Sequence, residues 1–130
     1  MTTRPARDMQ RARRGGRAHL SGLAAEEAAT RRYAGAGCAI LDRRWRGSAG
    51  EIDLVARDGS ALVFVEVKRA ATHAEAAERL SARQRARLCA SAEEYLGQAP
   101  GGLLTEMRFD VALVNGAGEV AVLENAFGAA

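Results

Sequence analysis

The sequence predicts an α/β protein with a central mixed β-sheet and a helix packed on either face of it. Two β-rich apolar runs flank Asp58-Gly59, a dipeptide typical of a tight hairpin turn. Segments with helical periodicity precede and follow this hairpin, and a second hairpin pattern lies near the end of the chain. The predicted order is α-β-β-β-α-β-β, with elements at about residues 21–34, 38–45, 51–57, 61–68, 75–97, 107–114 and 120–123.

Length and composition fit one soluble domain. The chain has 130 residues, of which 48% are hydrophobic. No apolar run approaches the length of a membrane span, and the N-terminus lacks the apolar core of a signal peptide, so we expect a cytoplasmic protein without a membrane partner. Cys38 and Cys89 lie in apolar contexts without metal-ligand spacing, and we expect them to be buried thiols.

Positive charge gathers at the N-terminus. Residues 1–20 hold many arginines, Pro5, Gly15 and Gly16 but little apolar material, which predicts a flexible arm ahead of a single domain at 21–130. With a net charge of +3, this distribution suits a polyanionic partner. A solvated tail without function is the alternative.

The first helix carries an acidic residue on its apolar side. Ser21-Gly22 opens the helix, and the glycines at 35 and 37 end it. Glu26 falls in the middle of the stripe that faces the sheet. An acid in a first turn also complements the helix dipole, but this position favours a carboxylate that meets a cation or hydrogen-bond donors inside the fold.

The predicted strand at 38–45 ends in a basic run with an aromatic residue inside it. Arg43, Arg44 and Arg46 surround Trp45. This combination suits phosphate contact with base stacking, and equally a solvated sheet edge with Trp45 anchored in the core.

Alternation along the central hairpin sorts its side chains onto two faces. Ile52, Leu54, Ala56, Val63, Val65 and Val67 are expected on one face. Any register that keeps these residues together also brings Asp53 close to Glu66 and Lys68 on the other face. A slip by one residue would bury charge among the valines, so the register is well specified.

The charged face of this hairpin has two interpretations. A solvated polar face is the commoner structure for such a pattern. However, Leu62-Val63-Phe64-Val65 is apolar on both faces, and the charges of Glu51, Asp53 and Glu66 then gather at one end of a covered strand. Carboxylates held together repel unless a cation joins them, either Lys68 or a divalent metal. Lys68 is the only lysine of an arginine-rich chain, which suggests a place for a compact ammonium.

We expect a loop at 70–74, which contains His73, and then one helix from Glu75 to about Gly97. Arginines cluster along this helix. They could contact phosphates or form a soluble helix face. The cluster comprises Arg79, Arg83, Arg85 and Arg87.

Four segments together resemble a known family. They are Ala25-Glu26, Gly50-Glu51-Ile52-Asp53-Leu54, Leu62-Val63-Phe64-Val65-Glu66-Val67-Lys68 and Arg108-Phe109-Asp110-Val111. From about residue 21 to 115 the chain resembles the bacterial YraN-like endonuclease family. That family is similar to archaeal Holliday-junction resolvases and has the restriction-endonuclease-like fold.

The resemblance implies a metal-dependent endonuclease that cleaves DNA, with branched or structured DNA as the suspected substrate. Asp53 and Glu66 would hold Mg²⁺, or Mn²⁺ in its place, and Lys68 would act on the attacking water. Glu26 would complete the catalytic set, and Glu51 is a further candidate metal ligand. The related resolvases act as dimers, so the resemblance also implies a homodimer.

This chain departs from the family pattern at positions that concern substrate contact. The arginine usually found two positions after the motif lysine is Ala70 here, with Arg69 displaced by one. The basic residue often found early in the second helix is Gln84, and the glycine that often precedes the helix glutamate is Ala25. The expected nucleic-acid contacts are therefore Arg43, Arg44, Arg46, Arg69 and Gln84.

Two other classes of function remain open. One is a nucleic-acid-binding module that keeps the nuclease fold without turnover, and the other is an interaction protein whose arginines meet a protein partner. The complete set of Glu26, Asp53, Glu66 and Lys68 favours the enzyme, because a degenerate binder tolerates the loss of any of them.

Overall fold

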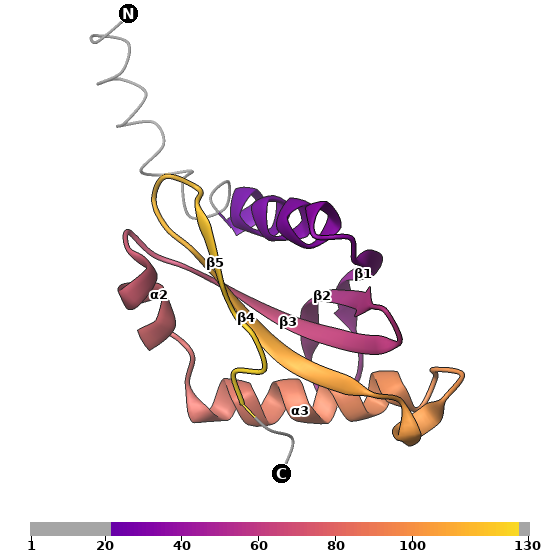
Figure 1. The fold of residues 1–130 in the computed structure, drawn as a ribbon. Helices are drawn as coiled ribbons and strands as arrows, with labels where there is room; N and C mark the ends of the chain where they lie inside the picture. Colours follow the sequence, from indigo (N-terminus) through magenta and orange to yellow (C-terminus); the bar gives the residue numbers. More distant parts are fainter. Residues whose placement is uncertain (1–21, 128–130) are drawn as a thin grey trace, which may run out of the picture.

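A five-stranded mixed sheet forms the centre of the protein (Figure 1). The computed structural model describes residues 22–127, so the arm expected at 1–20 lies outside the described residues. The strands lie side by side in chain order; β3 and β4 are parallel, and every other neighbouring pair is antiparallel. They are β1 (Ala39–Arg46), β2 (Glu51–Asp58), β3 (Ala61–Arg69), β4 (Met107–Val114) and β5 (Val120–Leu123). The predicted α/β class with a mixed sheet is confirmed.

Helices cover both faces of the sheet, as expected (Figure 1). The first helix, described from residue 22, ends at residue 35. Beyond its end the chain turns through Gly37 at φ +94°, and the Cys38 N–H donates to the Tyr33 carbonyl at 3.0 Å. Glycine adopts this backbone conformation without a Cβ penalty, which is why it ends helices so often. On the opposite face runs α3 (Ala82–Leu96).

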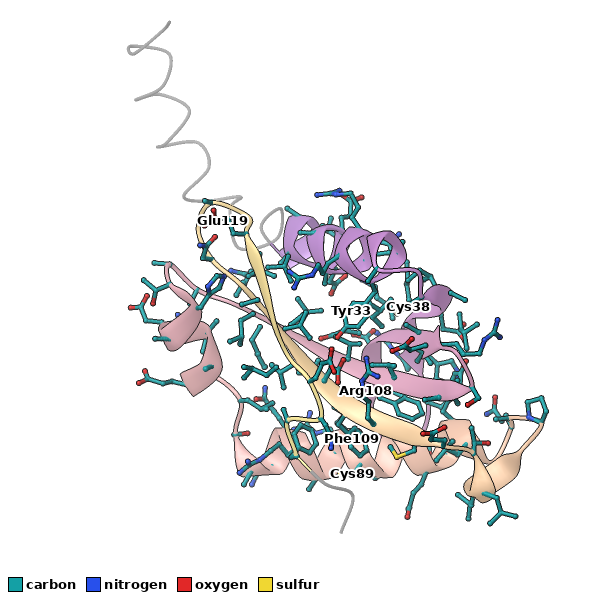
Figure 2. All side chains as sticks on the ribbon, in the orientation of Figure 1. Tyr33, Cys38, Cys89, Arg108, Phe109 and Glu119 are labelled. Atoms are coloured by element: carbon teal, nitrogen blue, oxygen red, sulfur yellow. The ribbon has the colours of Figure 1, made fainter. Side chains whose placement is uncertain are left out.

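The core consists of two apolar layers, one on each side of the sheet. The layer beneath α3 includes Phe64 and Phe109, and Figure 2 shows Phe109 directed from β4 toward α3. The layer beneath the first helix includes Ala29, Tyr33, Leu54, Ala56, Val63, Val65 and Ala112. Our prediction for Ile52 is wrong, because it packs in the α3 layer with Val55 instead of with Leu54. The alternation of β2 therefore breaks between Ile52 and Leu54.

The segment after β3 contains two helices where we expected a loop and one long helix. Helix α2 (His73–Glu78) begins at Thr72, whose hydroxyl accepts from the Glu75 N–H while the Glu75 carboxylate accepts from the Thr72 N–H. Ser81 and Gln84 repeat this reciprocal capping at the start of α3. A second capping box begins a new helix, so the continuous helix from 75 to 97 is wrong. His73 lies in α2 and not in a loop.

A buried carboxylate ties the first helix, the sheet and the C-terminal segment together. Asp110 is fully buried and accepts from the Tyr33 hydroxyl at 2.7 Å, from Arg108 Nε at 3.1 Å and from the Asn125 N–H at 2.9 Å. Arg108 also donates to Asp58 at 3.1 Å. Figure 2 shows Tyr33 reaching from the first helix toward the sheet beside Arg108. Because each donor forms a hydrogen bond with the buried carboxylate, this network stabilises the fold.

Both cysteines are free, as expected, but they are only partly buried. Burial raises the pKa of each thiol. Among the described residues, no helix combines the length and the apolar character needed to cross a membrane.

Candidate functional site

The candidate site lies where β2 and β3 diverge and their regular pairing ends. Regular pairing of the two strands runs from Asp58 opposite Ala61 to Leu54 opposite Val65. At the next residue, Asp53, a side-chain oxygen takes the place of a backbone carbonyl. Asp53 Oδ2 accepts from the Val67 N–H at 2.8 Å. The carboxylate is thus fixed between two diverging strands. The break in the alternation of β2 falls at this same residue.

Glu66 and Lys68 lie beside Asp53 on β3. Lys68 Nζ is 3.3 Å from Glu66 Oε2, and their side chains are only 14% and 16% exposed. Burial and the nearby Glu66 carboxylate raise the pKa of Asp53 to about 7. Burial also raises the pKa of Glu66, although Lys68 opposes this rise. Two half-buried carboxylates therefore lie close together, Lys68 pairs with Glu66, and Asp53 resists ionisation near neutral pH.

The other two predicted acids face this pair, and each is engaged by an arginine. Arg44 Nε donates to Glu26 Oε1 at 2.7 Å, and Arg46 Nη2 is 3.2 Å from Glu51 Oε2. Repulsion from both Glu26 and Glu51 contributes to the raised pKa of Asp53, so both lie near it. Arg44 is level with Asp53 in the pairing of β1 with β2, and its φ of +53° is rare for a residue with a side chain.

The donor set suits a hard divalent cation with few protein ligands. Among the described residues, 22–127, no group of three or more His, Cys, Asp and Glu side chains is arranged to hold a metal ion. Arginines pair with Glu26 and Glu51, whereas Asp53 accepts from the Val67 N–H and Glu66 pairs with Lys68. Mg²⁺ commonly takes one or two carboxylates and completes its shell with water and substrate phosphate. The residues present fit that cation.

The residues expected to contact nucleic acid occupy different parts of the molecule. Arg43, Arg44 and Arg46 lie on β1 and are all exposed, and the last two pair with Glu26 and Glu51. Arg69 ends β3 beside the first helix, where a Cβ on Gly22 would lie 3.7 Å from its Nε. Gln84 uses its side-chain oxygen to cap α3, accepting from the Ser81 N–H at 3.0 Å.

The sequence did not predict two of the groups near the site. The first is the Val67 N–H, which holds Asp53 and carries no side-chain signal at all. The second is Arg87 of α3, which lowers the raised pKa of Glu66 and therefore lies near it. The sequence placed Arg87 in a cluster of helix arginines but gave no means to decide which of them faces the sheet.

Comparison with known proteins gives the family. The model of a family described as "Uncharacterised protein family UPF0102" matches residues 25–114, a span that contains every acid of the site as well as Lys68. The chain belongs to family UPF0102.

Its similarity to other UPF0102 proteins extends over nearly the full length. A UPF0102 protein of Ruegeria pomeroyi is 56% identical over 117 residues, which cover 90% of this chain and 95% of the relative. One from Cereibacter sphaeroides is 53% identical, covering 85% of this chain and 95% of the relative. One from Dinoroseobacter shibae is 49% identical, covering 95% and 93%.

Proposed function

We propose that this UPF0102 protein is a Mg²⁺-dependent endonuclease with a restriction-endonuclease-like core, which hydrolyses phosphodiester bonds of branched or structured DNA. One observation carries the proposal: the half-buried carboxylates of Asp53 and Glu66 lie together near Lys68, at the point where β2 and β3 separate. Mn²⁺ is expected to substitute for Mg²⁺. A four-way junction presents two strands to cut, so we expect a homodimer to act on such DNA.

The chemistry follows from the residues around the carboxylate pair. Mg²⁺, when bound by Asp53 and Glu66, would neutralise phosphate charge and activate water for attack. Lys68 is held by Glu66 at 3.3 Å and presents an ammonium that can orient the attacking water or stabilise developing negative charge. The exposed arginines of β1 can hold neighbouring phosphates, because a guanidinium matches a phosphate with two parallel hydrogen bonds.

Glu26 has a conditional role in this scheme. Its carboxylate is paired with Arg44 at 2.7 Å, and the Arg44 side chain is 47% exposed. A DNA phosphate that engaged this guanidinium would compete with Glu26 for it. Glu26 would then be free to act with the carboxylate pair, so DNA binding would complete the acidic site.

The test is a panel of branched, nicked, single-stranded and duplex DNAs, each incubated with Mg²⁺, Mn²⁺ or EDTA. We expect wild-type protein to cut at least one structured DNA with either metal and none with EDTA. Asp53→Asn should abolish cutting, since it removes a ligand charge but keeps an oxygen for the Val67 N–H. Glu78→Gln, at an exposed position of α2, is the matched control and should cut normally.

A DNA-binding module without turnover is the second candidate. The arginine pairing of Glu26 and Glu51 favours it, because these ion pairs satisfy the acids without any metal. This candidate predicts DNA binding that EDTA does not change, and no cleavage of any DNA in the panel. Cleavage that persists in Asp53→Asn would instead reject the assigned metal site.

A further inference from the structure

One side of α3 is fastened to the loop that precedes β2. Glu94 accepts from the Ser48 N–H at 2.9 and 3.1 Å, from the Ser48 hydroxyl at 3.2 Å and from the Ala49 N–H at 3.4 Å. These donors lower the pKa of the Glu94 carboxyl, with the Ser48 N–H contributing most. Ser91 and Arg87 lie one and two turns earlier on the same side of the helix. All three residues therefore face the loop that leads into the site.

Arg87 fits against a glycine of that loop. Gly50 has φ +153°, and a Cβ on it would lie 3.0 Å from Arg87 Cδ and 3.2 Å from Arg87 Cγ. Any larger residue would push the arginine stem away. Gly50 directly precedes Glu51, the first residue of β2. The stem of Arg87 is thus positioned at the start of the strand that carries Asp53.

The contact with Gly50 places Arg87 on the α3 side of the segment that leads to Asp53, three residues further along the chain. Lys68 on β3 is the other cation of this region, 3.3 Å from Glu66. Arg87 is exposed, whereas Lys68 is mostly buried, so the two cations differ in their access to a ligand. Ser91 lies one turn after Arg87 on α3. Its fully buried hydroxyl has no hydrogen-bond partner within the described residues, and the Cβ position of Gly50 is 3.4 Å from its oxygen.

We propose that Arg87, positioned by Gly50, forms a phosphate-binding subsite on the α3 side of the Asp53–Glu66 pair. Its ligand is a phosphodiester group of the bound DNA strand, adjacent to the one that meets the carboxylates. Arginine suits this task because its planar fork binds phosphate oxygens in pairs, while Lys68 offers a single compact charge. The inference rests on the proposed function for the identity of the ligand, but it concerns binding and not hydrolysis.

The experiment measures DNA affinity by fluorescence anisotropy over a series of salt concentrations, in EDTA so that no DNA is cut. We compare Arg87→Ala with Arg85→Ala, a variant with the same charge change. Two positions separate these arginines, which places Arg85 about 200° away around α3. We expect Arg87→Ala to weaken binding roughly 5- to 10-fold and to reduce the salt slope by about 0.9, the value for one phosphate contact. Arg85→Ala should change neither.

A second variant moves the arginine without deleting it. Gly50→Ala should weaken binding in the same direction, and adding it to Arg87→Ala should cost little more, because both act on one contact. Circular dichroism and thermal unfolding check that each variant folds. Equal losses in Arg87→Ala and Arg85→Ala, or no binding by wild type, would overturn the subsite. An Arg87-specific loss in a protein that never cuts DNA would reject the proposed hydrolysis and keep the subsite.

Discussion

The pH dependence of stability offers a direct test of the carboxylate pair. In the folded protein the pKa of Asp53 is raised from 3.8 to about 7 by burial and by Glu66. In the unfolded chain the same carboxyl ionises near its ordinary value. Between these two pH values the folded state holds a proton that the unfolded state has lost. Stability contributed by Asp53 is therefore complete at low pH and falls as the pH rises toward 7.

The expected size of this effect follows from the rise in pKa. Each pH unit between the folded and unfolded pKa is worth about 1.4 kcal/mol, so the rise to about 7 corresponds to roughly 4 kcal/mol. Asp53→Asn removes the titration but keeps an amide oxygen that can accept from the Val67 N–H. We expect the variant to become more stable than wild type above pH 7 in EDTA, and the difference to shrink toward pH 4.

Urea denaturation at half-unit steps from pH 4 to pH 8.5 measures this difference, with Glu78→Gln as the control. Taking the difference between the two proteins cancels the titration of the groups that they share. A divalent ion should restore wild-type stability at high pH, by about 2.7 kcal/mol at a hundred times its dissociation constant, and should not stabilise Asp53→Asn. The reasoning is refuted if both proteins lose stability in parallel between pH 4 and 7, or gain equally from the metal.

Three further predictions concern catalysis, the fold and the N-terminal arm. Lys68→Ala should lower the cleavage rate about 10²–10³-fold with nearly unchanged DNA affinity. Lys68→Arg should not restore the rate, since a guanidinium is bulkier and keeps its proton. Single-turnover kinetics measures the rate, and a rate equal to that of wild type in Lys68→Ala would contradict this role. Asp110→Ala leaves the buried donors of Tyr33 and Arg108 without their acceptor and should cost about 3–5 kcal/mol in urea denaturation, far more than Glu78→Gln. Deleting residues 1–20 should weaken DNA binding and flatten its salt dependence while the circular dichroism spectrum of the domain persists; identical salt slopes would remove the arm from the interface.

Local sequence determined most strand bounds and the register of the central hairpin up to Leu54. The turn at Asp58-Gly59 and the alternation from Leu54 to Val65 are contained in one hairpin, so neighbouring residues specify it without reference to the rest of the fold. The same holds for β4 and β5, which begin and end where the pattern predicts. The break between α2 and α3 was also encoded, in Thr72 with Glu75 and Ser81 with Gln84, but helical periodicity masked it.

The sequence also indicated which acids belong to the site, because Asp53 and Glu66 share a hairpin whose register is fixed. It could not say what each acid contacts. The pairing of Glu26 with Arg44 joins the first helix to β1, and the proximity of Arg87 to Glu66 joins α3 to β3. Such contacts depend on how helices settle on the two faces of a twisted sheet, which no local pattern encodes. Ile52 shows the same limit within one strand. The Val67 N–H donates to the Asp53 side chain where the regular pairing ends, and Ile52 lies on the face opposite to the one that the alternation assigns.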